Sequence, residues 1–596
     1  MDKSKKTIRL YIAAPRSGKT RKICGNILKN SDISNFGKTR ILFTVGMVGD
    51  RNSDDSTAIS TIKTIKSINP FTTSVLLTSK VKICKRLFSN KMKIDDNPEY
   101  IKYLCSKCKR EKKITVDKML QTIEEHTCKI LSFDELMNIY NMGMCPEVFS
   151  KMYSQYCEMT IISKSKLEME MTYGGSINIF NKYELYIDEA HSMFNFCDVS
   201  PIVFSNCITN GKLNLKIIRD TLNDLYYNEL QSFIKKYNVN DKIYLMSLDL
   251  IKKRLDLLIE LIIKSLRRNE ENMLSDDFNI KMFHDLEFLS DALYSRAINE
   301  KNYLKQGKLF KLKSSVDSLM SLNGKYLITD VSNFGSITLR LYNVINSNGN
   351  KVISNPLKNE LFEKSDNTTL ITSTPFYPEY FKLWFDSDNY NVKLVTQEFT
   401  GTFYIFYTSG SCGVKNTFSD KYLNRHQKLI SVLSDEFDKS GDLYVLARNL
   451  LEKSLMEKYF ANFRNPTFDD YVGSRTSEGV QRNEALSVMF GFAYVPIDDY
   501  KQSAHLFRNT IGKNYPVEKV RTDFINMLSA MRTTQAMFRN ADLRYKRAHL
   551  IVNLSILELN LIKKFPLYRD KNIKFIEIPK NLRIEMYPKF IRKYIG

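Results

Sequence analysis

The 596-residue sequence lacks any apolar run long enough to cross a membrane. Its longest apolar stretch, Leu255–Lys264, carries three charges, and the basic N-terminal residues offer no apolar core of the kind that a signal peptide needs. Ten cysteines without a secretory signal argue against a disulfide scaffold. We therefore expect a soluble, intracellular protein, cytoplasmic or nuclear. Its residue usage is typical of an AT-rich genome, viral or plasmid origins included.

Glycine and proline are missing from one long region, between Lys212 and Gln306. Apolar residues recur within it at steps of three and four, as in Ile251, Leu255 and Leu258. This spacing is that of a helix with one apolar face, and nothing in the region interrupts it. The sequence therefore predicts an all-helical insertion, which we place at residues 196–324.

Positive charge is abundant. Lys and Arg outnumber Asp and Glu by 89 to 66, which gives a net charge of +23 at pH 7. A charge of this sign and size is typical of proteins that bind a polyanion. Nucleic acid is the first candidate and an anionic membrane surface the second; a solvated basic surface without a partner is the third.

The order of strands and helices indicates a parallel α/β sheet with both faces covered. A chain of this length predicts two to four domains. Residues 7–14 read as a buried strand, and Arg21–Lys29 reads as a helix. Further short apolar strands are predicted at Arg40–Val45, Ser74–Thr78, Tyr183–Ile187, Thr369–Ile371 and Asp442–Leu446.

The stretch Ala13–Thr20, AAPRSGKT, joins the first strand to the first helix and has the tail of a phosphate-binding loop. In such a loop the backbone N–H groups surround the phosphates, the lysine neutralises them, and the Ser/Thr hydroxyl ligates magnesium. Ser17, Gly18, Lys19 and Thr20 are therefore candidate ATP-binding residues. A chance match is the alternative, so the prediction requires an acidic partner.

That partner is found at Tyr186–His191, YIDEAH, where an apolar strand is followed by adjacent carboxylates. The carboxyl ends of parallel strands are where open α/β sheets bind ligands. Asp188 is predicted to hold Mg²⁺, and Glu189 to orient and deprotonate the attacking water. His191 is predicted to couple the nucleotide state to the rest of the site. An exposed acidic turn is the alternative interpretation.

Later motifs resemble those of superfamily 2 helicases, and more narrowly the XPD/DinG-type DEAH helicases. Leu370–Pro375, LITSTP, resembles their third motif. The segments Ser474–Gln481 and Ala485–Pro496 resemble the fifth-motif region, with its SEG signature. Ala530–Arg539 resembles the sixth motif.

The resemblance implies roles for residues in these motifs. Thr372, Ser373 and Thr374 would couple the ATP state to the nucleic-acid groove. The nucleotide contacts of the second half of the site would come from Glu478, Gly479, Gln535 and Arg539. Arg539 would act as an arginine finger that stabilises charge on the transferred phosphoryl group.

The resemblance also implies an α/β fold of two RecA-like P-loop motor domains. We expect the first motor to be divided into 1–80, 147–195 and 325–376. A cysteine-rich insertion at 81–146 and the all-helical, arch-like insertion at 196–324 would interrupt it. Residues 377–596 would form the second motor.

Members of this family commonly insert a four-cysteine iron–sulfur domain before the DEAH strand. The matching cysteines, and so the implied ligands of a [4Fe–4S] cluster, are Cys84, Cys105, Cys108 and Cys145. Zn²⁺ is the rival metal, because Cys105 and Cys108 with His126 and Cys128 also supply four N/S ligands. Reduced, buried cysteines without a metal are the third interpretation.

Several working positions depart from the family pattern. Alanine stands at the first loop glycine, Ala13, and arginine at a later one, Arg16. Gln481 replaces the fifth-motif Asp, and Phe538 replaces the Gly before the sixth-motif arginine. In an ungapped match the second arginine falls at Asp542. These departures predict slow hydrolysis or an altered site.

The function that the resemblance implies is ATP-dependent translocation on single-stranded DNA, 5′ to 3′, with unwinding of duplex, and it needs Mg²⁺. One alternative is a nucleic-acid-stimulated ATPase that acts in transcription or remodelling without separating strands. The other is a non-catalytic nucleic-acid-binding scaffold derived from a helicase. On this interpretation the basic charge serves nucleic acid and not a membrane.

Overall fold

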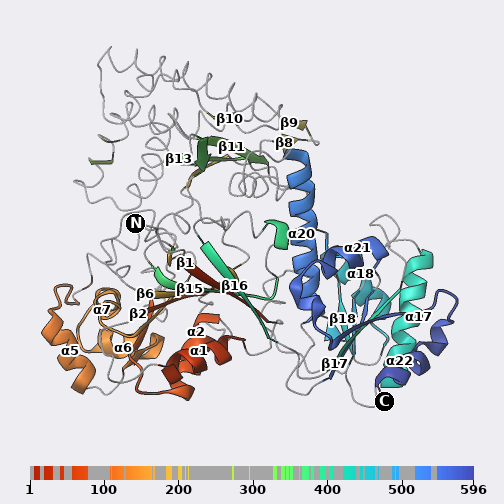
Figure 1. The fold of residues 1–596 in the computed structure, drawn as a ribbon, viewed down its shortest axis with the longest axis horizontal. Helices are drawn as coiled ribbons and strands as arrows, with labels where there is room; N and C mark the ends of the chain where they lie inside the picture. The colour runs from red at the N-terminus through yellow and green to blue at the C-terminus, as the bar shows by residue number, and fades with distance from the viewer. Residues whose placement is uncertain are drawn as a thin grey trace, which may run out of the picture.

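The described helices and strands of this computed structural model form two parallel-sheet units and a smaller antiparallel sheet (Figure 1). The structure describes residues 6–13, 19–30, 40–45, 57–77, 83, 108, 110–125, 129–163, 166–167, 183–190, 199–204, 208–209, 212–213, 272–273, 291, 294–295, 326–331, 337–342, 344–347, 350–353, 362, 365–374, 377–380, 390–397, 402–408, 420–437, 443–447, 450–463, 467–468, 486–489, 491–494, 517–538, 547–552 and 554–595. None of the helices in these ranges is long and apolar enough to span a membrane.

The first unit is built on an eight-stranded sheet in which every strand pair is parallel. Its strands, in order across the sheet, are β16 (Tyr390–Thr396), β1 (Lys6–Ile12), β15 (Ser365–Thr372), β6 (Tyr183–Asp188), β2 (Arg40–Val45), β5 (Met159–Ser163), β3 (Ser74–Leu77) and β4 (Ile130–Leu131). Strand β15 lies between β1 and β6 in the sheet, although it is far from both in the sequence.

Alternating side chains of these strands enter two separate cores. Leu185 and Ile187 of β6 join one core, whereas Tyr186 packs against the other. Helices α1 (Lys19–Asn30) and α2 (Thr57–Ile68) cover this second face through side chains such as Ile23 and Ile62. Burial on both faces explains why the strands are short apolar runs, as expected of a covered parallel sheet.

Three helices pack beside β3 at the far side of the first sheet: α5 (Val116–Glu125), α6 (Phe133–Asn141) and α7 (Pro146–Tyr153). Helix α6 begins at Ser132 with a capping box, in which Glu135 accepts from the Ser132 N–H at 3.0 Å. Helix α7 begins with Pro146, whose missing N–H costs nothing at that position.

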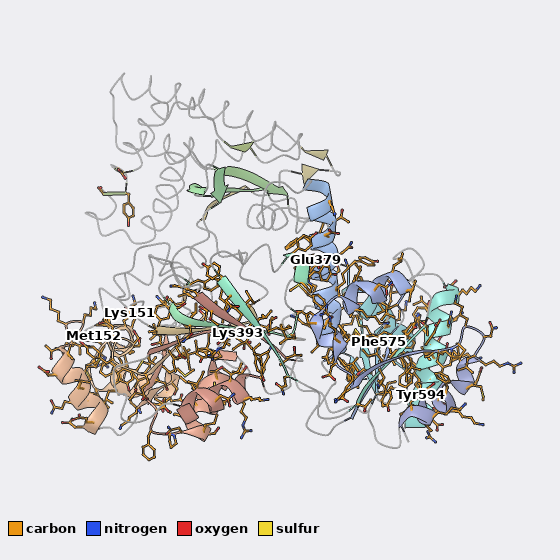
Figure 2. All side chains as sticks on the ribbon, in the orientation of Figure 1. Lys151, Met152, Glu379, Lys393, Phe575 and Tyr594 are labelled. Atoms are coloured by element: carbon orange, nitrogen blue, oxygen red, sulfur yellow. The ribbon has the colours of Figure 1, made fainter. Side chains whose placement is uncertain are left out.

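The second unit is a six-stranded sheet whose strand pairs are again parallel. Its strands, in order, are β19 (Thr467–Phe468), β18 (Leu443–Leu446), β20 (Leu486–Met489), β21 (Arg547–Val552), β17 (Thr402–Tyr407) and β22 (Ile573–Glu577). Its helices are α17 (Asp420–Phe437), α18 (Leu450–Phe460), α20 (Val517–Met537), α21 (Ile556–Lys563), η9 (Pro566–Arg569), η10 (Ile584–Met586) and α22 (Tyr587–Ile595). In Figure 2, Phe575 lies on β22 and Tyr594 at the C-terminal helix.

The described residues of the predicted all-helical insertion include strands as well as the helical positions Asp291, Tyr294 and Ser295. They contain β7 (Val199–Phe204), β8 (Ile208–Thr209), β9 (Lys212–Leu213) and β10 (Asn272–Met273). Strands β7 and β10 complete an antiparallel sheet with β11 (Tyr326–Val331) and β12 (Ile337–Tyr342), in the order β10-β11-β12-β7. The pairing of β7 with β12 joins residues more than a hundred positions apart, which a local periodicity cannot reveal.

The sheets also divide the chain differently from the expected domain limits. Strand β4 extends the first sheet although it lies within 81–146, and β16 joins that sheet although it lies beyond residue 376. Strands β11 and β12, with the hairpin of β13 (Val344–Ser347) and β14 (Asn350–Ile353), lie within 325–376 but outside both parallel sheets. A two-residue strand and a largely exposed strand give little apolar signal, which is why β4 and β16 escaped prediction.

Candidate active site

The predicted nucleotide residues lie where β6 ends and α1 begins, at the carboxyl edge of the first sheet. Helix α1 starts at Lys19, after the strand β1, and β6 ends at Asp188. The carboxyl edge of a parallel sheet is the usual ligand site of such folds, and a helix N-terminus favours anions. Ser17, Gly18 and His191, which were predicted to belong to this site, lie outside the described residues.

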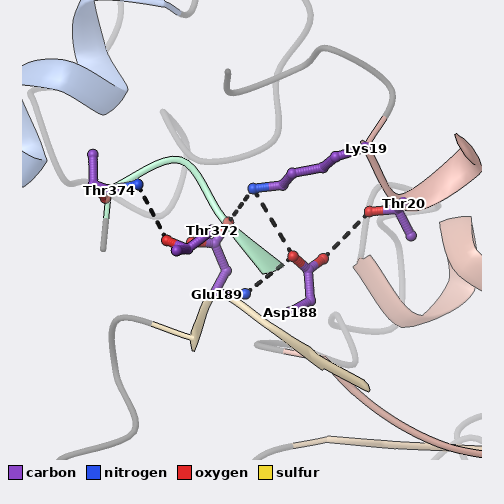
Figure 3. Close-up of polar contacts among 6 residues, drawn as sticks. All are labelled: Lys19, Thr20, Asp188, Glu189, Thr372 and Thr374. Carbon is purple, nitrogen blue, oxygen red and sulfur yellow. Dashed lines mark hydrogen bonds and ion pairs between the residues drawn. The ribbon is translucent and has the colours of Figure 1, made fainter. Parts of the chain in front are cut away.

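Lys19 is held between the two carboxylates of the DEAH segment, as Figure 3 shows. Its Nζ lies 3.4 Å from Glu189 Oε1 and 3.9 Å from Asp188 Oδ1, and the residue is only 8% exposed. Burial acts to lower the pKa of Lys19, but the two carboxylates outweigh it and hold the pKa above its usual value. The ammonium group is therefore charged and balances the acids.

Thr20 and Asp188 form the second contact between the two motifs. The Thr20 hydroxyl donates to Asp188 Oδ2 at 3.3 Å, and the Glu189 N–H donates to Asp188 Oδ1 at 3.0 Å. Burial raises the pKa of Asp188, and Lys19 opposes this rise by attracting the charged form. A buried carboxylate beside a hydroxyl is an oxygen donor set of the kind that Mg²⁺ prefers, so these residues fit a magnesium site.

Glu189 has a backbone conformation that its residue type rarely adopts. Its φ is 53°, in the left-handed region, and it is the non-glycine residue with positive φ in the described ranges. Such strain persists only where the surrounding structure enforces it, and it is concentrated at functional sites. Here the turn directs the Glu189 side chain back toward Lys19 at the strand end (Figure 3).

The segment Thr372–Thr374, which resembles the third motif, lies at the end of β15. In the sheet, β15 lies between β1, which precedes Lys19 and Thr20, and β6, which carries Asp188. Ala13, which replaces the first loop glycine, is fully buried and donates its N–H to Thr372 O at 3.2 Å. The Thr374 N–H donates to the Thr372 hydroxyl at 3.2 Å, which turns the chain at the strand end. Thr372, Ser373 and Thr374 are all buried, so this segment lies inside the molecule beside Glu189 (Figure 3).

Only part of the second half of the predicted site falls in the described residues. Glu478, Gly479 and Arg539 lie outside them. Gln535 lies on α20 and is partly exposed, whereas its neighbours Thr534 and Ala536 are buried. The structure therefore describes the helix that contains most of the segment resembling the sixth motif, but not Arg539, which was predicted to be an arginine finger.

Phe538 shows how the chain accommodates one departure from the family pattern. The residue is fully buried, and its ring stacks on Phe403 of β17 with the centroids 4.6 Å apart. Tyr568 lies on another side, with its centroid 6.0 Å away. The phenylalanine therefore fills the core of the second unit, where stacked aromatic pairs add to the stability gained by burial.

Two of the four predicted iron–sulfur ligands lie on neighbouring segments. The Cys145 N–H donates to Glu111 O at 2.9 Å, and the Glu111 N–H donates to Gly143 O at 2.8 Å, which joins the segment just after Cys108 to the start of α7. Cys84, Cys105, His126 and Cys128 lie outside the described residues. Within the described part of the chain, no three His, Cys, Asp or Glu side chains gather as they would around a metal ion.

Two tyrosines that the sequence analysis did not single out link this edge to the second unit. Tyr377 and Tyr380 follow the third motif and contact α20 and α21. Their only signal in the sequence is the aromatic-rich stretch FYPEY directly after LITSTP. Helices that belong to other parts of the chain determine what such residues touch, so the motif alone could not identify them.

The known proteins that resemble this chain do so in structure. A solved structure titled XPD helicase matches it with a TM-score of 0.53 at 15% identity, over 96% of this chain and 96% of that one. A second, titled XPD in the apo form, matches with a TM-score of 0.40 at 12% identity, over 94% and 99% of the two chains. No protein-family model matches the sequence. No curated protein matches it either. The chain therefore has an XPD-like, helicase-like fold.

Proposed function

We propose that this chain is an ATP-dependent DNA helicase of the XPD/DinG type, which moves 5′ to 3′ along single-stranded DNA and unwinds duplex. One observation supports this proposal above all: at one edge of the first sheet, Lys19 and Thr20 contact Asp188 and Glu189. These four residues come from two motifs that are about 170 positions apart. An XPD-like fold supports the same function.

The four residues divide the work of phosphoryl transfer. Lys19 exchanges its contacts with the carboxylates for the phosphates of ATP and neutralises them. Thr20 and Asp188 would hold Mg²⁺, which supplies positive charge against the phosphate oxygens. Glu189 then loses its lysine partner, and its carboxylate orients the attacking water and accepts a proton from it.

The second unit completes the site on this proposal. Gln535 and Arg539 reach the nucleotide from the sixth-motif segment, and Glu478 and Gly479 from the fifth. Arg539 stabilises the charge of the transition state. His191 and the segment Thr372–Thr374 couple the nucleotide state to the nucleic-acid groove.

Translocation follows from alternating closure of the two units on ATP and reopening after hydrolysis. The excess of Lys and Arg, with a net charge of +23, supports binding to the phosphate backbone of nucleic acid. Exposed aromatic side chains can stack on unpaired bases, which favours a single strand as the track.

The cysteine-rich segment would carry a structural metal group. Cys108 and Cys145, on segments that hydrogen-bond to each other, would hold a [4Fe–4S] cluster together with Cys84 and Cys105. Such a cluster would supply covalent cross-links to a segment with a small core. Zn²⁺ held by Cys105, Cys108, His126 and Cys128 is the other arrangement that the ligand types allow.

The experiment that tests the function is ATP hydrolysis by protein purified without oxygen, with and without single-stranded DNA. Lys19→Ala and Glu189→Gln are the test variants, and Lys22→Ala, an exposed lysine on α1, is the matched control. Forked duplexes with a 5′ or a 3′ single-stranded tail test unwinding and direction. Single-stranded RNA in place of DNA tests the choice of nucleic acid.

DNA-stimulated hydrolysis that both test variants lose and Lys22→Ala keeps would support the proposal, as would unwinding of the 5′-tailed fork alone. Hydrolysis without unwinding of either fork would replace it with a nucleic-acid-stimulated ATPase. Hydrolysis no faster than that of the variants, in folded protein that still binds DNA, would replace it with a non-catalytic scaffold.

A further inference from the structure

The chain passes from the candidate active site into a core that residues of both parallel sheets share. The third-motif segment ends at Thr374, and three residues later Tyr377 is 1% exposed and belongs to the core that also contains Phe524 and Met527 of α20. Figure 2 shows Glu379, between the two tyrosines, beside α20. Only a few residues therefore separate the segment Thr372–Thr374 from the residues that contact α20.

Tyr377 is fixed from two helices at once. Its N–H contacts Met527 Sδ of α20 at 3.2 Å, and its hydroxyl donates to Leu561 O of α21 at 3.2 Å. Its ring lies 5.3 Å from that of Phe565 and beneath the Lys564 ammonium at 4.7 Å. Burial and the nearby Glu379 raise the pKa of Tyr377, so its hydroxyl remains a donor. This residue is a permanent anchor of the segment on the second unit.

Tyr380 makes a different kind of contact. Its N–H donates to Tyr377 O at 2.9 Å, which places it one turn along the chain, and its hydroxyl donates to Asp523 Oδ2 on α20. The Tyr380 side chain is buried, at 4% exposed, in the same core as Tyr377, but Asp523, which accepts from its hydroxyl, is partly exposed. A bond of this kind can break and re-form without disturbing the core.

Asp523 and Met527 are four residues apart, so the two tyrosines hold one face of α20. The same helix continues to Gln535, about 18 Å beyond Asp523 at 1.5 Å per residue. A hydrogen bond from Ala493 N to Thr533 Oγ1 at 3.1 Å fastens α20 to the segment that follows β20. A helix held in this way turns or shifts as one body.

We infer that Tyr380 and Asp523 form a coupling contact, which makes α20 follow the third-motif segment and so positions Gln535 when the nucleotide state changes. The inference rests on the proposed function. Neither residue touches the nucleotide; both are positioning residues. Their loss should affect the rate of hydrolysis while the affinity for ATP, which depends on Lys19 and Thr20, is kept.

The test uses the full chain and the variant Tyr380→Phe, which removes the hydroxyl and keeps the buried ring. Asp523→Asn retains an oxygen acceptor and Asp523→Leu removes it. Tyr407→Phe is the matched control, because that hydroxyl also contacts a carboxylate of the second unit, Glu577 Oε2, at 3.5 Å. The readouts are kcat and KM for ATP with single-stranded DNA, and hydrogen exchange of α20 with and without a non-hydrolysable ATP analogue.

We expect Tyr380→Phe and Asp523→Leu each to lower kcat about tenfold, the scale of one charged hydrogen bond, with KM for ATP unchanged. The double variant should match either single variant, while Asp523→Asn and Tyr407→Phe should resemble the parent. The analogue should change the exchange of α20 in the parent and the control but not in Tyr380→Phe.

The inference would be overturned if Tyr380→Phe had the kcat of the parent and the analogue changed its α20 exchange as it does in the parent. Additive losses in the double variant would overturn it as well. The exchange measurement separates this failure from failure of the proposed function. If the parent hydrolyses no ATP but the analogue still alters α20 only when Tyr380 keeps its hydroxyl, the coupling holds and the helicase proposal falls. If the analogue leaves α20 of the parent unaltered, the coupling itself is absent.

Discussion

The two parallel sheets of this chain have similar architecture but end in different chemistry. At the carboxyl edge of the first sheet, a lysine and an aspartate are buried within 3.9 Å of each other, and a strained Glu189 follows them. At the same edge of the second sheet, β20 is followed by Phe492 and Ala493, which are buried against α20. Charge is concentrated at one edge and apolar packing at the other.

This difference indicates that the two sheet edges have different roles. Buried charges cost stability unless they are paired, so a sheet edge that keeps them does so for a reason other than stability. The second edge instead fixes a helix: Thr533 accepts from Ala493 N, and the Tyr568 hydroxyl donates to Thr534 Oγ1 at 3.0 Å. On the proposed function, the first edge would carry the chemistry and the second would present α20 to it.

The proposed difference in role between the two sheet edges requires that the second unit contributes to hydrolysis. The variant Arg539→Ala tests this contribution directly. We expect kcat to fall about a thousandfold, because a finger arginine stabilises the transition state, while ATP binding through Lys19 persists. Arg569→Ala, an exposed arginine of η9, is the matched control and should be silent. Equal kcat for the two variants would show that the altered sixth motif has lost its finger.

The proposed metal site would be a second difference between the units, because the [4Fe–4S] cluster or Zn²⁺ would belong to the first unit alone. Cys108→Ser and Cys145→Ser should each abolish iron binding in anaerobically purified protein, measured by elemental analysis and visible absorption. Serine is a favoured N-cap, so Cys145→Ser keeps the start of α7 and its loss of metal is not a loss of the helix. Cys24→Ser, on the buried side of α1, is the control and should retain the metal.

Bound zinc in place of iron, lost equally in Cys108→Ser and in a His126→Ala variant, would favour the zinc arrangement. No metal in the parent protein would leave the cysteines as reduced thiols and remove this difference between the units.

Much of the first sheet and of its edge could be predicted from the sequence, because both depend on local signals. Arg40–Val45 coincides with β2, and the strand predicted at Thr369–Ile371 lies within β15. The contact between Thr20 and Asp188 was also predictable, because a loop after one parallel strand and an acid after another meet at the same edge. The strain at Glu189 has no signature in the residue type.

What could not be predicted depends on partners distant in the chain. Strand β16 is largely exposed and acquires its place only by pairing with β1, almost four hundred residues away. Tyr380 is one of 33 tyrosines, and only its contact with Asp523 separates it from the others. Phe538 departs from the pattern of the sixth motif, and its packing against Phe403 shows that it occupies a core position.

That last point makes Phe538→Ala a test of packing in the second unit. The variant should destabilise this unit by about 3–5 kcal/mol, because it opens a cavity between stacked rings. Hydrogen exchange of peptides from β17 and η9 should report the loss, while the first unit keeps its ATP affinity. Phe71→Ala, an exposed phenylalanine of the first unit, should cost almost nothing. An equal loss of protection in both units would mean that they unfold together and that the division between them is only architectural.

The smallest expected effect concerns Thr374, a threonine of the first unit, and Thr20 serves as the contrast. Among the described residues, Thr374 has a fully buried hydroxyl for which the structure shows no hydrogen-bond partner, whereas Thr20 donates to Asp188. An unsatisfied buried hydroxyl costs free energy, so Thr374→Val, which keeps the shape, should raise the free energy of unfolding of the first unit by about 1 kcal/mol. Thr20→Val should instead lose Mg²⁺-dependent ATP binding. Denaturant unfolding followed by exchange of first-unit peptides measures the first effect, and a fall in stability would show that the Thr374 hydroxyl has a partner that sustains the fold.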